Sequence, residues 1–242
     1  MRDLVRIGGF QRASLVEYPG KVSAVVFTIG CNLRCPFCYV PWLVIPNGMD
    51  GVKEIREDDV LAYIKRNAGL IDAVVVTGGE PTLQDDLPDF FRKVKQAGLL
   101  TGIETNGSNF LMLEKLIREK LVDHVAMDVK TALEYKKYKN VTGGALTMEL
   151  FENVRKSLSM IMGSKISYEF RTTLVKEYHT KEDIIEICKS IVGAKAYYLQ
   201  NLQPTKRFLG GERFTPFSEK EIGEILSEGK KYVNIVYRKG YA

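Results

Sequence analysis

The chain has 242 residues, of which 45% are hydrophobic and 27% are charged. These proportions are those of an ordinary globular protein and exclude collagen-like, low-complexity and disordered classes. No apolar run approaches the roughly 18 residues of a membrane span, and the first residues lack the apolar centre of a signal peptide, so we expect a cytoplasmic protein. The net charge of +5 comes from lysines and arginines spread along the chain. This spread disfavours a nucleic-acid-binding stripe and leaves room for docking of acidic partners, such as small electron carriers.

Short β-type runs alternate with helical segments along the chain. The runs are rich in Val, Ile and Tyr and mostly end at Gly, Asp or another polar residue. Their near-continuous apolar character predicts strands covered on both faces, as in parallel sheets. They span Val22–Thr28, Asp72–Thr77, Leu99–Glu104, Val122–Asp128, Ile166–Val175 and Ala196–Leu202, and Tyr232–Tyr237 is a candidate for a final strand.

The segments between these runs have the periodicity of helices that bury one face. In residues 86–97, four apolar side chains (Leu87, Phe90, Phe91 and Val94) recur at i, i+3, i+4 and i+7, and a glycine follows as a stop signal. Further helices are expected at 57–68 and 110–119, and after the capping residues Thr147, Thr180 and Ser218. The last two caps begin sequences typical of a capping box.

The order β-α is repeated about six times, at about 30 residues per repeat. Because strand–helix–strand crossovers are right-handed, such repeats curl into a doubly wound sheet or a barrel. Six repeats are too few for the usual eight-stranded barrel. We therefore predict an α/β fold, an open partial (β/α)6 barrel of the TIM type with parallel strands. The whole chain, 1–242, is expected to form one domain, with a leader (1–20), a barrel core (21–203) and a C-terminal extension (204–242).

Three cysteines lie in one short loop after the first predicted strand. Cys31, Cys35 and Cys38 have the spacing C-x3-C-x2-C, so their sulfurs can converge on a compact centre. Iron–sulfur clusters are normally held by four thiolates, so three would leave one iron open to another ligand. A structural zinc site is the alternative, but it usually needs four ligands in two separated pairs, and neither histidine is near this loop in sequence. The fourth cysteine, Cys188, lies on a helical stripe of isoleucines and is predicted to be a core residue.

Polar residues also follow the later strands. The second strand ends in Thr77-Gly78-Gly79-Glu80-Pro81, where glycines would let the backbone approach a ligand closely. The third and fourth end in Glu104-Thr105-Asn106-Gly107 and Asp128-Val129-Lys130, and Arg171 and Gln200 lie on the fifth and sixth. In such folds, ligand sites form where parallel strands end. Each strand end taken alone is also explained by a turn or a surface ion pair, and Arg171 by a structural ion pair.

The loop Cys31-x3-Cys35-x-Phe37-Cys38, with an aromatic residue before its last cysteine, resembles the signature of the radical S-adenosylmethionine (SAM) superfamily. The resemblance implies a [4Fe–4S] cluster on the three cysteines, with SAM chelating the open iron. It also implies that the cluster reductively cleaves SAM to a 5′-deoxyadenosyl radical, and that Gly78, Gly79 and Glu80 bind the methionine amino group of SAM. The other predicted cofactor contacts are Phe37, Tyr39, Thr105, Asn106, Asp128, Lys130, Arg171 and Gln200.

The leader Gly8–Gly20 and the segments Glu104–Gly107 and Asp128–Lys130 resemble the glycyl-radical-enzyme activases, in particular the activating proteins of anaerobic ribonucleoside-triphosphate reductase. Glu104 stands where the family usually has Asp. The resemblance implies that hydrogen is abstracted from a glycine of a partner glycyl radical enzyme, with a flavodoxin- or ferredoxin-type electron carrier as donor. Three alternatives remain: a radical SAM enzyme that acts on a small molecule, a peptide or RNA; an electron-transfer iron–sulfur protein; and a structural zinc module.

Overall fold

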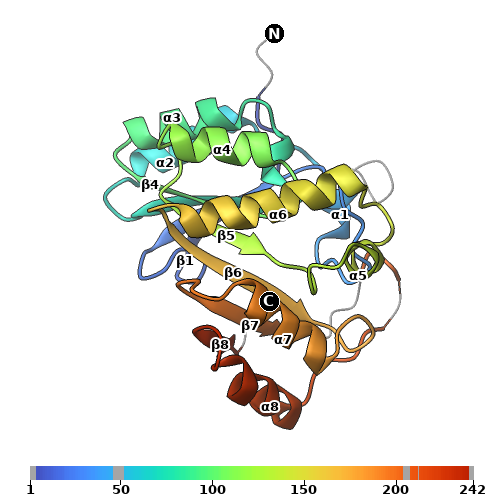
Figure 1. The fold of residues 1–242 in the computed structure, drawn as a ribbon. Helices are drawn as coiled ribbons and strands as arrows, with labels where there is room; N and C mark the ends of the chain where they lie inside the picture. Colours follow the sequence, from blue (N-terminus) through green and yellow to red (C-terminus); the bar gives the residue numbers. More distant parts are fainter. Residues whose placement is uncertain (1–3, 46–51, 204–207, 212, 240–242) are drawn as a thin grey trace. The chain divides into compact units, whose positions relative to one another are not determined.

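A computed structural model of the protein describes residues 4–45, 52–203, 208–211 and 213–239. The chain divides into two compact units, which are described separately (Figure 1). Unit 1 comprises residues 1–32, 42–105 and 109–125, and unit 2 comprises residues 33–41, 106–108 and 126–242. Parts of the predicted C-terminal extension, residues 204–207, 212 and 240–242, lie outside the described residues. That the whole chain forms one domain stays a prediction.

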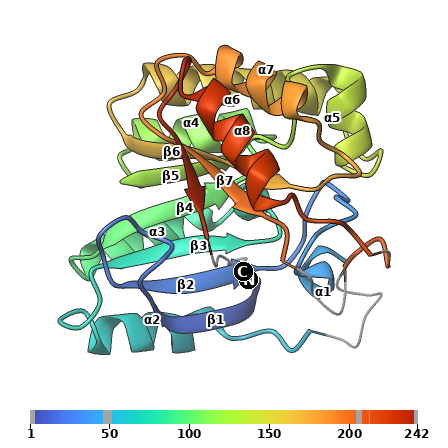
Figure 2. The ribbon, with the colours of Figure 1, turned by 90° about the horizontal axis from the view of Figure 1, so that it is seen from below.

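Unit 1 contains four strands that lie side by side in chain order (Figure 2). They are β1 (Ile7–Ser14), β2 (Ser23–Thr28), β3 (Ala73–Gly78) and β4 (Leu100–Thr105). β1 pairs antiparallel with β2, whereas the pairs β2–β3 and β3–β4 are parallel. The helical elements are α1 (Pro41–Val44), which begins at the unit boundary, α2 (Glu57–Arg66), the 3-10 turn η1 (Pro81–Leu83), α3 (Leu87–Gln96) and α4 (Phe110–Arg118).

Unit 2 contains the parallel strands β6 (Ser167–Leu174), β7 (Tyr197–Asn201) and β8 (Ile235–Arg238), again in chain order. Strand β5 (His124–Asp128) crosses the boundary between the units. The helices are α5 (Tyr135–Val141), α6 (Met148–Gly163), α7 (Lys181–Ser190) and α8 (Glu219–Gly229). Helices α7 and α8 pack against one another (Figures 1 and 2).

These elements confirm the predicted α/β class with parallel strands in an open sheet. Each of the six predicted strands is present with bounds that differ by two residues at most, and the candidate final strand is β8. The expected stripe of α3 is fully buried, and Cys188 is buried on α7 as predicted. Both capping boxes form, at Thr180 and at Ser218. The leader, for which no strand was predicted, forms β1, and α1, η1 and α5 were not predicted either.

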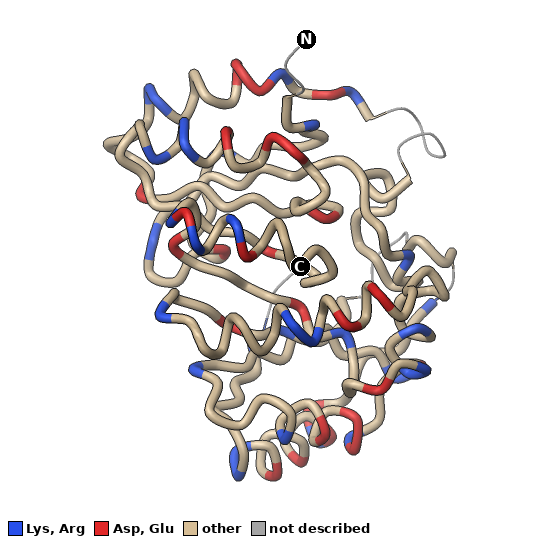
Figure 3. The backbone as a smooth tube through the Cα atoms, turned by 45° about the horizontal axis from the view of Figure 1, so that its top comes forward, with Lys and Arg blue, Asp and Glu red and all other residues tan. Residues whose placement is uncertain are grey.

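Charged residues of both signs are interspersed along the described chain, in agreement with the sequence expectation (Figure 3). Several pair across elements. Lys93 on α3 lies 2.6 Å from the buried carboxylate of Glu57 on α2, and Lys95 lies 2.8 Å from Asp123. Within the described residues, no helix is both long and apolar enough to cross a membrane.

Candidate functional site

The end of β3 lies directly against the backbone that leads into the cysteine loop. Gly79 N–H donates to Thr28 O at 3.0 Å, and Glu80 N–H donates to Gly30 O at 2.8 Å. A Cβ at Gly79 would lie 1.9 Å from Gly30 O. Gly78 has φ +115°, and a Cβ there would lie 2.4 Å from Thr28 N. The two glycines therefore allow a close approach to the protein's own backbone, and their contact with a ligand stays a prediction.

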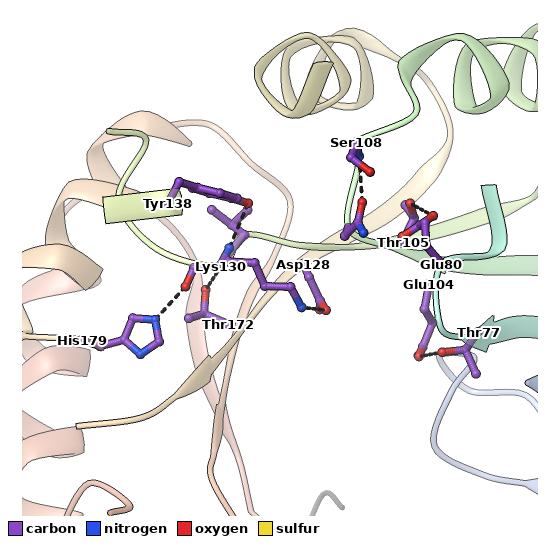
Figure 4. Close-up of polar contacts among 12 residues, drawn as sticks. Thr77, Glu80, Glu104, Thr105, Ser108, Asp128, Lys130, Tyr138, Thr172 and His179 are labelled. Atoms are coloured by element: carbon purple, nitrogen blue, oxygen red, sulfur yellow. Dashed lines mark hydrogen bonds and ion pairs between the residues drawn. The ribbon is translucent and has the colours of Figure 1, made fainter. Parts of the chain in front are cut away.

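Glu80 is a buried carboxylate, with 1% of its surface exposed. Its Oε1 accepts hydrogen bonds from the Thr82 backbone N–H at 3.1 Å and the Thr82 hydroxyl at 2.6 Å. The same oxygen accepts the Thr105 hydroxyl at 2.7 Å (Figure 4). Glu80 thus caps η1, and it also ties the ends of β3 and β4 together. A buried carboxylate fixed in this way is oriented before any ligand arrives.

The segment Glu104–Gly107, at the end of β4, belongs partly to unit 1 and partly to unit 2. In unit 1, Glu104 accepts a hydrogen bond from the Thr77 hydroxyl at 2.8 Å, across neighbouring strands (Figure 4). In unit 2, Asn106 Oδ1 accepts the Ser108 backbone N–H at 2.9 Å, which closes a turn. Gly107 follows with φ +74°, and a Cβ there would collide with Met127. Asn106 and Gly107 therefore shape the turn, and Thr105 supports Glu80.

In unit 2, Cys35 and Cys38 share one tight turn, in which Cys38 N–H donates to Cys35 O at 3.0 Å. Burial raises the pKa of the Cys35 thiol to about 11, while the nearby charge of Lys130 acts in the opposite direction. The pKa of Cys38 is also raised, again chiefly by burial. Without a bound metal centre, both thiols are therefore protonated at neutral pH.

This turn is held in place by two later segments of unit 2. Arg34 N–H donates to Thr142 O at 3.1 Å after α5, and Gly143, with φ +67°, leaves no space for a Cβ beside Arg34 O. A second segment also contacts the turn: Gly210 N–H donates to Pro36 O at 2.8 Å. The loop is thus fixed by main-chain contacts from residues more than a hundred positions away.

Aromatic side chains form the second anchor of the loop. Phe37 is buried and packs against Tyr178 and Phe214, with ring centroids 5.8 and 6.5 Å apart. Tyr39 packs against Phe208 at 5.8 Å, and its hydroxyl accepts the Gln203 backbone N–H at 2.8 Å. Both predicted contacts therefore use their side chains in packing, so any contact with an adenine at this place would come from the loop backbone.

Asp128 and Lys130, at the end of β5, form an ion pair of 2.5 Å (Figure 4). Burial alone would lower the pKa of Lys130, but Asp128 and Cys35 raise it above its usual range, so the ammonium group stays charged. The backbone N–H and the backbone carbonyl of Lys130 each have a hydrogen-bond partner. Its N–H donates to the Tyr138 hydroxyl at 3.0 Å, and its carbonyl lies 2.6 Å from His179 Nε2.

His179 is buried, and burial lowers its pKa. A neutral ring that carries its proton on Nε2 donates to the Lys130 carbonyl and accepts the Val175 backbone N–H on Nδ1, 3.1 Å away. The ring therefore holds the loop after β5 and does not act as a metal ligand in this arrangement.

Arg171, on β6, forms a buried ion pair with Glu169 at 2.5 Å, and Glu169 also binds Arg238 of β8 through both oxygens. The alternative considered from the sequence, a structural ion pair, is thus present. Gln200, on β7, is partly exposed and lies in register with Arg238.

Sequence reasoning missed several residues that support these positions, namely Tyr138, Glu169, His179, Phe208, Phe214 and Arg238. None of them belongs to a local motif. Most of them act on residues distant in the chain, so the packing of unit 2 reveals them.

The donor set suits an iron–sulfur cluster. All four cysteines are free thiols, Cys31 is partly exposed, and the charge of Lys130 near the turn of Cys35 and Cys38 partly offsets the rise in thiol pKa that burial causes. Among the described residues, no group of three metal-ligating side chains is preformed. The assignment of three thiolates to one cluster therefore rests on their spacing in the sequence.

The chain matches a family model and several named proteins. Residues 25–191 match the family described as "Radical SAM superfamily". A Methanocaldococcus jannaschii protein named "Putative glycyl-radical enzyme activating enzyme" is 33% identical over 96% of this chain and 95% of its own length. The pyruvate formate-lyase-activating enzyme of Clostridium pasteurianum is 32% identical over 57% of each chain.

Solved structures share the fold at low sequence identity. TYW1 with a lysine–pyruvate adduct superposes with a TM-score of 0.61 at 18% identity, over 86% of this chain and 73% of that one. Streptococcus suis SuiB bound to its precursor peptide gives a TM-score of 0.64 at 13% identity, over 88% of this chain and 48% of SuiB. These likenesses agree with the predicted partial barrel, and the predicted cofactors, a [4Fe–4S] cluster and SAM, are those of the matching family. By the family match across its central residues and by its near full-length relative, the chain belongs to the radical SAM superfamily.

Proposed function

We propose that this radical SAM enzyme is an activase that installs a radical on a glycine of a partner glycyl radical enzyme. When bound, the cluster and SAM supply a 5′-deoxyadenosyl radical, which removes a hydrogen atom from the glycine Cα. The chain's own residues bind and orient the cofactors and admit the partner's peptide. No general base is required, which agrees with the structural role of His179.

One observation carries the proposal. The similarity to the M. jannaschii protein extends over nearly the whole of both chains, so it includes the leader and the C-terminal residues as well as the superfamily region at 25–191. The partial match to a pyruvate formate-lyase-activating enzyme supports the same class.

We assign cluster binding to Cys31, Cys35 and Cys38, and the methionine amino group of SAM to Glu80. Burial and three fixed hydrogen bonds orient the Glu80 carboxylate, which suits a charge-assisted contact with an ammonium group. Lys130 and Arg171 are charged and restrained by neighbouring carboxylates, and we assign them to the methionine carboxylate. We assign Asp128 to the ribose.

The electron required for SAM cleavage would come from a small acidic carrier of the flavodoxin or ferredoxin type. The net charge of +5 supports docking of such a protein. The partner would be a glycyl radical enzyme, and an anaerobic ribonucleotide reductase is the first candidate.

The test is to mix the reduced, cluster-loaded protein with SAM and a candidate partner under anaerobic conditions. We expect a glycyl radical signal by electron paramagnetic resonance, and transfer of deuterium from labelled glycine into 5′-deoxyadenosine. Cys188→Ala should give the same signal, whereas Cys38→Ala should give none. Formation of 5′-deoxyadenosine without transfer from any glycyl radical enzyme would contradict the activase assignment.

A second candidate is a radical SAM enzyme that modifies a peptide. It is favoured by the structural likeness to SuiB, which was solved with a precursor peptide. In the same experiment, this candidate predicts deuterium transfer from a peptide substrate and no stable radical on a partner protein.

A further inference from the structure

In unit 2, strands β6 and β8 carry a cluster of three charged residues, of which Glu169 and Arg171 are buried and Arg238 is partly buried. Glu169 and Arg171 are two positions apart on β6, so their side chains lie on the same face. Both are nearly inaccessible, with 2% and 6% of their side chains exposed. Arg171 Nε lies 2.5 Å from Glu169 Oε1. Nε is the guanidinium nitrogen bonded to the aliphatic part of the side chain, so this hydrogen bond restrains the plane of the Arg171 guanidinium group.

The third residue of the cluster is Arg238 on β8. Because β7 lies between β8 and β6, its side chain has to extend past β7 to reach Glu169. Arg238 is in register with Gln200, and Gln200 is in register with Thr173 on β6. From there, its two Nη atoms reach both Glu169 oxygens, at 2.8 and 2.6 Å. The guanidinium carbon lies 3.4 Å from the centroid of the Tyr198 ring on β7. The planar guanidinium group of arginine can bind both oxygens of a carboxylate while it stacks on a ring, and the ammonium group of lysine cannot.

This arrangement restrains Glu169 completely. Burial would raise the pKa of Glu169, but the two guanidinium groups lower it, so the carboxylate stays ionised. With both oxygens held by Arg238, Glu169 has one orientation in which to meet Arg171. A buried ion-pair network is weak support for stability, because apolar residues of similar volume often serve as well or better. The cluster is therefore better explained by the geometry it imposes.

We propose that Arg238 is a positioning residue for the SAM site, acting through Glu169 to fix the guanidinium plane of Arg171. The inference rests on the proposed function, which assigns Arg171 to the methionine carboxylate of SAM. A carboxylate is bound best by a guanidinium group whose plane is already set, since less freedom is lost on binding.

The experiment measures SAM affinity in cluster-loaded protein, by anaerobic titration of the change that SAM causes in the paramagnetic resonance spectrum of the reduced cluster. The variants are Arg171→Gln, Arg238→Gln, the double variant, and Lys239→Gln as a control. Lys239 is the next residue in the chain, and its exposed ion pair with Glu219 has no part in the cluster. Iron content and melting temperature are recorded for each variant.

We expect Arg238→Gln to weaken SAM binding by about three- to tenfold at unchanged iron content, and the double variant to bind no more weakly than Arg171→Gln, since residues that act through one another are not additive. Lys239→Gln should bind SAM like the wild type. If Arg238→Gln does not fold, Arg238→Lys, which keeps the charge but not the two-oxygen contact, should show the same weakening and the same non-additivity.

The inference would be overturned if the losses of SAM affinity in Arg171→Gln and Arg238→Gln were additive in the double variant. It would also be overturned if both Arg238 variants bound SAM with wild-type affinity. Wild-type affinity in Arg171→Gln would overturn it as well, while the proposed function would stand. A wild-type protein that loads its cluster but binds no SAM would overturn both.

Discussion

At the scale of single residues, Glu80 combines a structural and a proposed binding role. Its carboxylate caps η1 and accepts the Thr105 hydroxyl, and it is buried in unit 1. Glutamine at this position keeps an oxygen for the same donors but removes the negative charge. The two roles can therefore be separated by one substitution.

We expect Glu80→Gln to leave folding nearly unchanged and to weaken SAM binding by about 1–3 kcal/mol, because a charge-assisted hydrogen bond to the SAM amino group is lost. Anaerobic titration with SAM measures this change. The control is Glu57→Gln, which removes another buried carboxylate of unit 1, paired with Lys93. It should lower stability without changing SAM affinity. Equal SAM affinity in wild type and Glu80→Gln would count against the placement.

The cysteines differ in their surroundings, and this difference gives a second prediction. Cys188 is buried on α7, and burial raises its pKa to about 12. We expect Cys188→Ala to keep the wild-type iron and sulfide content after anaerobic reconstitution. Alanine at Cys31, Cys35 or Cys38 should remove or badly destabilise the cluster, because a three-thiolate site has no spare ligand. Loss of iron from Cys188→Ala would mean that four thiolates close the cluster and that no iron is open.

At the scale of elements, strand ends and loops are held together by backbone contacts that tolerate no added atoms. The end of β3 meets Gly30, immediately before Cys31. In unit 2, a Cβ at Gly143 would lie 2.0 Å from Arg34 O, and one at Gly210 would make a tight contact of 3.0 Å with Pro36 Cβ. The cysteine loop therefore depends on glycines outside its own motif.

We expect Gly79→Ala to lower the free energy of unfolding by about 1–3 kcal/mol or more, because its Cβ would overlap the Gly30 carbonyl and force the two segments apart. Cluster loading should fall with it, since Cys31 follows directly. Urea unfolding and iron analysis measure the two effects. Gly69→Ala is the matched control, because a Cβ at Gly69 meets nothing within 4 Å. Equal stability of the two variants would show that the β3 contact is not required.

At the scale of the whole molecule, the buried side chain of His179 makes stability depend on pH. The pKa of His179 in the folded protein is lowered from its ordinary value of 6.5 by burial. A group whose pKa is lowered on folding contributes stability above its ordinary pKa, and this stability is lost as the pH falls towards the folded value. Protonation would also require Nδ1 to turn from the Val175 N–H to the Val175 carbonyl.

We therefore expect the cluster-free protein to lose stability as the pH is lowered from about 7 to about 5, with urea unfolding at each pH as the measurement. His179→Gln should be less stable at neutral pH but should show a smaller dependence over this range. An equal slope in wild type and variant would assign the pH dependence to other groups.

The sequence by itself determined the order of strands and helices, the helix caps and the cysteine loop. These features are local: a strand or helix face repeats within a few residues, and the motif Cys31–Cys38 lies within eight. The leader was the exception, because β1 exists only through its pairing with β2. Only the tertiary structure revealed how His179 fixes Lys130, and how Arg238 holds Glu169 across β7. Such contacts depend on strand register and packing between residues far apart in the chain, and they leave no periodic trace in the sequence.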